Sequence, residues 1–123
     1  METMQSVLNA SVRRNDSGSD LGMMLSRRIS RVFERISPVR GRALLFGSRA
    51  RGDARPDSDW DVLILLDKDS ITPSDMDEVG YPLREFGWEA DMMINPIMYT
   101  EKDWQKRHMT PFYANVMKEG IPL

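Results

Sequence analysis

The chain has 123 residues, of which 41% are apolar and 29% charged, and this predicts a single globular domain with a buried core. The formal net charge of −2 gives no broad basic surface, so nucleic acid is not indicated, and the absence of cysteine excludes disulfides and thiolate metal sites. Apolar runs fall short of the roughly 20 residues that span a membrane, and the first residues lack a secretory pattern. We therefore expect a cytoplasmic protein that has no membrane partner.

The N-terminal part of the chain is predicted to be helical. Apolar residues recur at helical spacing in residues 1–14, and a polar break follows. We therefore predict a short helix and linker over residues 1–19 and the folded domain over residues 20–123. Asp20 is expected to cap a helix that runs to about Ser37, and most of the arginines on that helix are expected to lie on its solvated face.

Three strands are predicted in the domain. Residues 42–46 and 61–66 are short apolar runs, and the second is apolar at consecutive positions. This pattern is typical of a strand in a sheet that helices cover on both faces. Residues 88–94 alternate between polar and apolar side chains, which predicts the third strand.

Helices are predicted between and after these strands. Thr72 can cap a helix that Pro82 should kink or interrupt. Thr100 and Thr110 can start two shorter helices near the C-terminus. This order of elements predicts an α/β (α+β) domain in which helices flank a small mixed sheet.

The pair Gly47-Ser48 directly follows the first predicted strand. A glycine lets the backbone turn tightly and approach a ligand closely. A helix that starts at Ser48 would point free N–H groups at that ligand, and the hydroxyl adds one more donor, which suits a phosphate. A strand followed by Gly-Ser is also compatible with a simple turn.

Asp59 and Asp61 open the apolar run of the second predicted strand. Residues two apart in a strand face the same side, about 6.5 Å from each other. Two carboxylates at this distance repel by roughly 2–3 kcal/mol at an effective dielectric constant near 20. A cation would offset this repulsion, and oxygen ligands on a rigid strand suit Mg²⁺, which commonly shares its coordination sphere with substrate phosphates.

A third carboxylate is expected on the predicted strand over residues 88–94, where Glu89 and Asp91 share a face. If this strand lies beside the strand of Asp61, Asp91 completes a carboxylate triad that could hold two metal ions. Asp91 would then ligate the second metal ion and help to deprotonate an acceptor hydroxyl. Glu89 is the alternative third carboxylate, and a charge at the edge of the strand is the alternative role for Asp91.

The segment Gly47–Gly52 together with Ser58-Asp59-Trp60-Asp61 resembles the signature of the nucleotidyltransferase superfamily, the group related to DNA polymerase beta. The short chain is similar to the minimal nucleotidyltransferase-domain proteins of bacteria and archaea. The resemblance implies the nucleotidyltransferase fold for residues 20–123. It also implies that Asp59 and Asp61 hold Mg²⁺ and that Asp91 takes the third acidic position. The residues expected to bind the nucleotide are Gly47, Ser48, Arg49, Arg51 and Ser58.

By this resemblance, the protein transfers a nucleoside monophosphate from a nucleoside triphosphate, expected to be ATP, to a hydroxyl group and releases pyrophosphate. The acceptor would lie on a protein or a small molecule. Some minimal members are antitoxins that pair with a small helical toxin of the HEPN group and transfer AMP to a tyrosine of that toxin. A HEPN-type toxin or a second copy of the chain is therefore an expected partner. The alternative is an antitoxin or regulatory binding module that binds nucleotide and partner without turnover.

Overall fold

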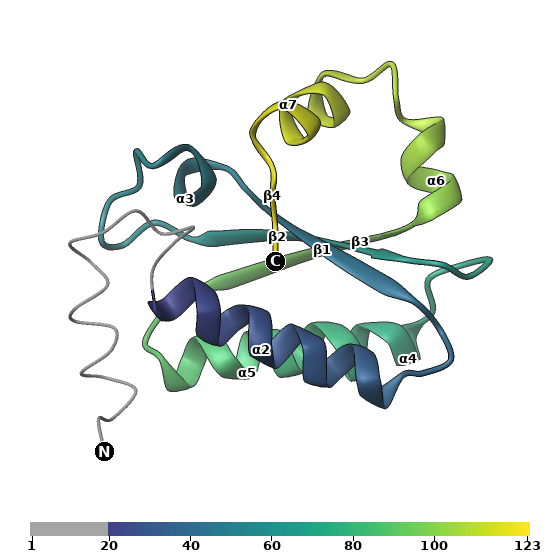
Figure 1. The fold of residues 1–123 in the computed structure, drawn as a ribbon, viewed down its shortest axis with the longest axis horizontal. Coiled ribbons are helices and arrows are strands. Elements are labelled where there is room, and N and C mark those ends of the chain that lie inside the picture. Colours follow the sequence, from purple (N-terminus) through teal and green to yellow (C-terminus); the bar gives the residue numbers. More distant parts are fainter. Residues whose placement is uncertain (1–19) are drawn as a thin grey trace.

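The computed structural model describes residues 20–123, which form a four-stranded sheet with helices on both faces (Figure 1). The predicted short helix and linker over residues 1–19 lie outside the described residues. The strands are β1 (Gly41–Phe46), β2 (Trp60–Leu66), β3 (Ile94–Thr100) and β4 (Ile121–Pro122). The helices are α2 (Asp20–Arg35), α3 (Ser48–Arg51), α4 (Pro73–Asp75), α5 (Tyr81–Glu89), α6 (Glu101–Lys106) and α7 (Pro111–Glu119). Within residues 20–123, no helix is long and apolar enough to cross a membrane.

The sheet is mixed, as the sequence predicted, with the strand order β3-β2-β1-β4. Strand β1 is antiparallel to β2 and β4, while β2 and β3 are parallel. The register places Asp61 opposite Phe46 on one side and opposite Asn95 on the other. The start of β2 therefore lies between the end of β1 and the start of β3.

Strand β2 is apolar on both of its faces because helices cover both faces of the sheet (Figure 1). Val62 and Ile64 belong to the core under α2 and α5, whereas Leu63 and Leu65 belong to the core that includes Trp104 of α6 and α7 residues. Since side chains alternate along a strand, Asp61 shares the face of Leu63 and Leu65. The site at Asp61 therefore lies on the side of the sheet that carries α6 and α7.

The third strand begins later than the sequence predicted, and the prediction of a strand over residues 88–94 is wrong. Helix α5 continues through Glu89, and β3 starts only at Ile94. The apolar side chains of Leu83, Phe86 and Ala90 are buried at helical spacing. This burial outweighs the local alternation that favoured a strand, and Asp91 lies in the intervening turn with a φ of 55°.

Pro82 was predicted to kink or interrupt the preceding helix, and the structure shows a change of hydrogen-bond pattern within a chain that stays helical. The chain forms a turn of π-helix over Met76–Gly80 between α4 and α5, and Pro82 occupies the first turn of α5. Proline has no N–H to donate to the helical ladder, and a local change of the hydrogen-bond pattern accommodates this loss. The predicted cap at Thr72 is also present, because its hydroxyl accepts from the Asp75 N–H.

The Asp75 carboxylate is expected to stabilise the fold in a way that depends on pH. Burial acts to raise the pKa of its carboxyl group, but hydrogen bonds from Lys68 and Thr72, at 2.8 Å each, outweigh burial and lower the pKa. Stability from this carboxylate is therefore present above its ordinary pKa in the unfolded chain, about 3.8, and is lost as pH falls through the lower folded value. We expect Asp75→Asn to reduce the free energy of unfolding by about 1–2 kcal/mol at pH 7.

Urea denaturation of both proteins at pH 7 and at pH 3 measures this effect. The difference in the free energy of unfolding between the two proteins should shrink at pH 3, because the carboxyl group is then largely protonated in the unfolded chain and the stability from the folded carboxylate is being lost. A difference of equal size at both pH values would contradict the role given to the carboxylate.

Candidate active site

The turn after β1 meets the start of β2 because these strands pair in antiparallel register. Phe46 is opposite Asp61, so Gly47, the next residue, lies beside the Asp61 carboxylate. A Cβ atom on Gly47 would stand 2.5 Å from Asp61 Oδ2. Gly47 also has φ 78° and ψ −158°, a conformation that essentially only glycine adopts. Both the backbone and the close approach to Asp61 therefore require a glycine at this position.

Asp59 and Asp61 lie near each other, as predicted from their spacing. Burial is the main cause that raises the pKa of the Asp61 carboxyl group, and a hydrogen bond from Asn95 Nδ2, at 3.2 Å, acts in the opposite direction. The charge of Asp59 raises this pKa further, and Arg51 lowers it. A divalent cation would favour the ionised form of both carboxylates, so the electrostatics suit the predicted metal-binding role.

The short helix α3 follows Gly47 and ends at Arg51. Within residues 20–123, the Ser48 hydroxyl has no hydrogen-bond partner, which leaves it available to a ligand. The Arg51 guanidinium contacts two carboxylates, with Nε at 3.2 Å from Asp53 Oδ2 and Nη1 at 3.1 Å from Glu119 Oε2. Ser48 and Arg51 thus bring a hydroxyl and a cation to the turn beside Asp61.

Arg49 and Ser58, also predicted to bind nucleotide, hold the loop that leads to Asp59. Arg49 is only 4% exposed, and its guanidinium donates to the carbonyl oxygens of Ser58 and Pro56, at 3.0 and 3.2 Å. It also stacks over the Trp60 ring, 5.0 Å from the centroid. The Ser58 hydroxyl accepts from the backbone N–H of Arg55. These contacts fix the loop before β2 and therefore the position of Asp59.

The predicted carboxylate triad is not formed. Asp91 lies in the turn before β3, and Asn95 is the β3 residue opposite Asp61. Glu89, the alternative, forms an ion pair with Arg28 at 3.2 Å. In the part of the chain that the structure describes, no group of three or more acidic, histidine or cysteine residues could hold a metal ion. The candidate metal ligands that remain together are Asp59 and Asp61.

Glu119 is a residue of the site that the sequence did not indicate. It is the last residue of α7. Its Oε1 accepts from the Gly47 N–H at 3.1 Å, while its Oε2 accepts from Arg51. The contact with Gly47 spans 72 residues of sequence, and the two-residue strand β4 that follows Glu119 has no clear sequence pattern. Asn95 was not predicted as a site residue, because the third strand was expected over residues 88–94 and β3 begins only at Ile94.

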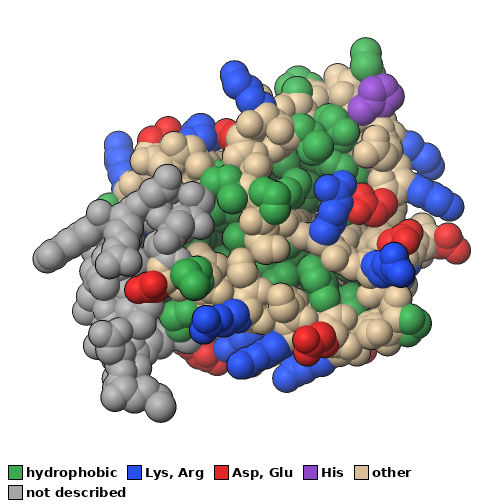
Figure 2. All heavy atoms as spheres, viewed as in Figure 1, with side chains coloured by type: hydrophobic (Ala, Val, Ile, Leu, Met, Phe, Trp, Pro, Cys, Tyr) green, Lys and Arg blue, Asp and Glu red, His purple; other side chains and the backbone are tan. Residues whose placement is uncertain are grey.

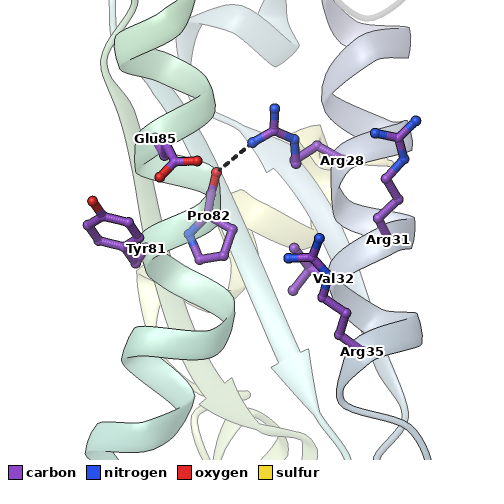
Figure 3. A pocket seen from close by; sticks show the side chains of 7 residues that line it. All are labelled: Arg28, Arg31, Val32, Arg35, Tyr81, Pro82 and Glu85. Atoms are coloured by element: carbon purple, nitrogen blue, oxygen red, sulfur yellow. Dashed lines mark hydrogen bonds between the residues drawn. The ribbon is translucent and has the colours of Figure 1, made fainter.

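A groove of about 400 Å³ lies apart from this site, between α2 and α5 (Figure 3). It is lined by Arg28, Arg31 and Arg35 from α2 and by Tyr81, Pro82 and Glu85 from α5. Basic side chains gather over α2 in Figure 2, in agreement with the predicted solvated face. Because α2 and α5 cover the face of the sheet opposite to the Asp61 side chain, this groove is separate from the carboxylate pair.

Comparison of the sequence with known proteins identifies a matching family and two similar proteins. The sequence model of the family described as "Nucleotidyltransferase domain" matches residues 26–119 of the chain. These residues include the Gly47-Ser48 turn, Asp59, Asp61 and Glu119. Two similar proteins of Methanocaldococcus jannaschii are named "Putative protein adenylyltransferase", MJ0141 and MJ0604. The first is 35% identical over 80 residues, which cover 65% of this chain and 75% of the relative. The second is 37% identical over 87 residues, which cover 68% and 81%, respectively.

The two glycines of the turn provide a matched test of the site. Gly52 has a φ of 85°, and a Cβ atom there would meet no atom within 4 Å, whereas one on Gly47 would meet Asp61. We expect Gly52→Ala to reduce the free energy of unfolding by about 1–2 kcal/mol and Gly47→Ala by about 3 kcal/mol. Denaturant unfolding measures both values.

The clash with Asp61 can be isolated by a double-mutant cycle. Since Asp61→Ala removes the atoms that the new methyl group meets, Gly47→Ala should be less destabilising in that background. Equal effects of Gly47→Ala in the presence and absence of the Asp61 carboxylate would show that the two residues are not in close contact.

Proposed function

Because the chain belongs to the family of nucleotidyltransferase-domain proteins, we propose that it transfers AMP from ATP, with Mg²⁺, to a hydroxyl group on another protein. Nucleotidyl transfer itself follows from the family match and from the two relatives. The choice of ATP and of a protein acceptor rests on the relatives, which are named as protein adenylyltransferases. The single observation that carries the proposal is the approach of the Gly47-Ser48 turn to the Asp61 carboxylate.

The turn is proposed to bind the triphosphate. Gly47 lets the backbone come close to the phosphates, and the Ser48 hydroxyl donates a hydrogen bond to them. Arg51 supplies a positive charge at the end of α3. Arg49 and Ser58 take part through the loop that they hold, so their proposed contribution is the placement of Asp59.

The Asp59 and Asp61 carboxylates are proposed to hold Mg²⁺. Their donor set fits this ion, which binds through one or two carboxylates and completes its coordination with water and substrate phosphates. When bound, Mg²⁺ would neutralise charge that develops on the phosphate oxygens. No third carboxylate from β3 is required in this proposal, and Asn95 orients Asp61 through its hydrogen bond.

The proposed reaction is an in-line displacement. The acceptor oxygen forms a bond to the α-phosphorus of ATP, and the bond from that phosphorus to the oxygen bridging the α- and β-phosphates breaks. Pyrophosphate leaves with the electron pair of the broken bond. The proton of the acceptor hydroxyl passes to water.

A partner is proposed to supply the acceptor hydroxyl. The fold described above leaves no second domain within residues 20–123 to bind an acceptor. A small helical toxin of the HEPN group is one proposed partner, and a second copy of this chain is the other. Mass measurement of the protein purified together with each candidate, followed by a search for AMP-modified hydroxyl residues, distinguishes between them.

The second candidate function is a binding module that holds nucleotide and a partner without turnover. The observation that favours it is the presence of Asn95, rather than an acid, opposite Asp61. An amide cannot take a proton from the acceptor or supply a negative charge to a second metal ion. Nucleotide binding without label transfer would support this function.

Asp61→Asn tests the transfer reaction. With ATP labelled on its α-phosphate, Mg²⁺ and lysate of the source cell, wild-type protein should move the label to a discrete acceptor. Asp61→Asn should lose at least about 100-fold in rate, because the amide removes the charge that holds the cation. The control is Asp57→Asn, which changes an exposed loop residue close by and should retain the wild-type rate.

Asp91→Asn distinguishes an active site with two carboxylates, Asp59 and Asp61, from the predicted site with three. A rate near that of the wild type supports an active site that contains only Asp59 and Asp61. A loss as large as that of Asp61→Asn would give Asp91 a catalytic role. Full activity of Asp61→Asn would contradict the proposed metal site.

A further inference from the structure

The last residue of α7 carries a carboxylate that contacts the turn at two points. Glu119 Oε1 lies 3.1 Å from the backbone nitrogen of Gly47, and Oε2 lies 3.1 Å from Arg51 Nη1. Gly47 precedes α3, and Arg51 is the final residue of this helix. A single side chain therefore holds both ends of the turn that leads from β1.

The backbone around Glu119 is itself fixed to the sheet. Val116, one turn earlier in α7, is fully buried, and its carbonyl accepts from the Gly120 N–H at 2.7 Å. Ile121 then pairs with Leu45 of β1. A Cβ atom on Gly120 would lie 2.5 Å from the Val116 carbonyl oxygen, so the chain can pass here only without a side chain. Glu119 is thus presented to the turn from a rigid support.

The burial of Glu119 distinguishes this contact from an ordinary surface ion pair. The Glu119 side chain is 19% exposed and that of Arg51 is 48% exposed. An ion pair between fully exposed side chains contributes only about 0–1 kcal/mol to stability. The bond to Gly47 differs, because its donor is a backbone N–H in a conformation that only glycine adopts. Loss of Glu119 should therefore alter the shape of the turn more than the stability of the fold.

We propose that Glu119 is a positioning residue for the triphosphate, holding the Gly47 backbone and the Arg51 side chain in the arrangement that receives the phosphates. This role rests on the function proposed above. The charge of Glu119 reaches Asp61 and helps to raise the pKa of that carboxyl group, but its hydrogen bonds go to Gly47 and Arg51. The positioning contacts of Glu119 are therefore with the turn. It also makes the C-terminal end of the domain part of the nucleotide site.

Glu119→Gln tests this role. Glutamine keeps the size of the side chain but has one uncharged acceptor oxygen, so it cannot replace both carboxylate oxygens that accept from Gly47 and Arg51. The matched control is Glu101→Gln. Glu101 pairs with Arg42 at the opposite end of β1, at 2.7 and 3.0 Å, so the control also breaks one Arg–Glu pair and changes the net charge equally. Affinity for a non-hydrolysable ATP analogue with Mg²⁺ is measured by calorimetry, and thermal unfolding is measured for each protein.

We expect Glu119→Gln to bind the analogue roughly tenfold more weakly than wild type, while Glu101→Gln binds it as wild type does. The two variants should unfold at similar temperatures. In the transfer assay, the KM for ATP should rise for Glu119→Gln with little change in kcat, because the turn binds the triphosphate and the carboxylate does not touch the reacting atoms.

Equal affinity of Glu119→Gln and wild type would overturn the positioning role and leave the proposed function intact. Tighter binding by Glu119→Gln would also overturn it, and would show instead that the carboxylate competes with the phosphates for Gly47 and Arg51. A wild-type protein that fails to bind the analogue would overturn the proposed function, and the positioning role with it.

Discussion

The antiparallel pairing of β1 with β2 is the constraint on which the site depends. It places Phe46 opposite Asp61 and therefore brings Gly47 against the Asp61 carboxylate. A shift of register by one residue would turn the Asp61 side chain towards the core under α2 and α5, where an unpaired charge is strongly unfavourable. The cost of burying the Asp61 carboxylate thus favours the register that brings the turn and the carboxylate together.

Much of this arrangement could be predicted because its signals are local in sequence. The apolar runs of β1 and β2, the Gly47-Ser48 step and the Asp-x-Asp spacing each depend on a few consecutive residues. The cap at Thr72 and the interruption near Pro82 are local in the same way. The mixed sheet with flanking helices followed from the order of these elements.

The third strand and the contacts of α7 could not be predicted from such signals. Residues 88–94 alternate in polarity, but Leu83, Phe86 and Ala90 bury one side of a helix, and this tertiary packing decides the local structure. As a consequence, Asn95 rather than an acid lies opposite Asp61. Glu119 reaches Gly47 only through the docking of α7 and β4 on the sheet, which no local pattern indicates.

A crystal structure of the protein with Mn²⁺ and a non-hydrolysable ATP analogue, in which anomalous scattering locates the metal ion, would show whether Asp59 and Asp61 form the metal site. We expect Mn²⁺ on the carboxylates of Asp59 and Asp61, with the phosphates against the turn from Gly47 to Arg51. A metal ion at another position, or a nucleotide bound in the arginine-lined groove between α2 and α5, would contradict this expectation.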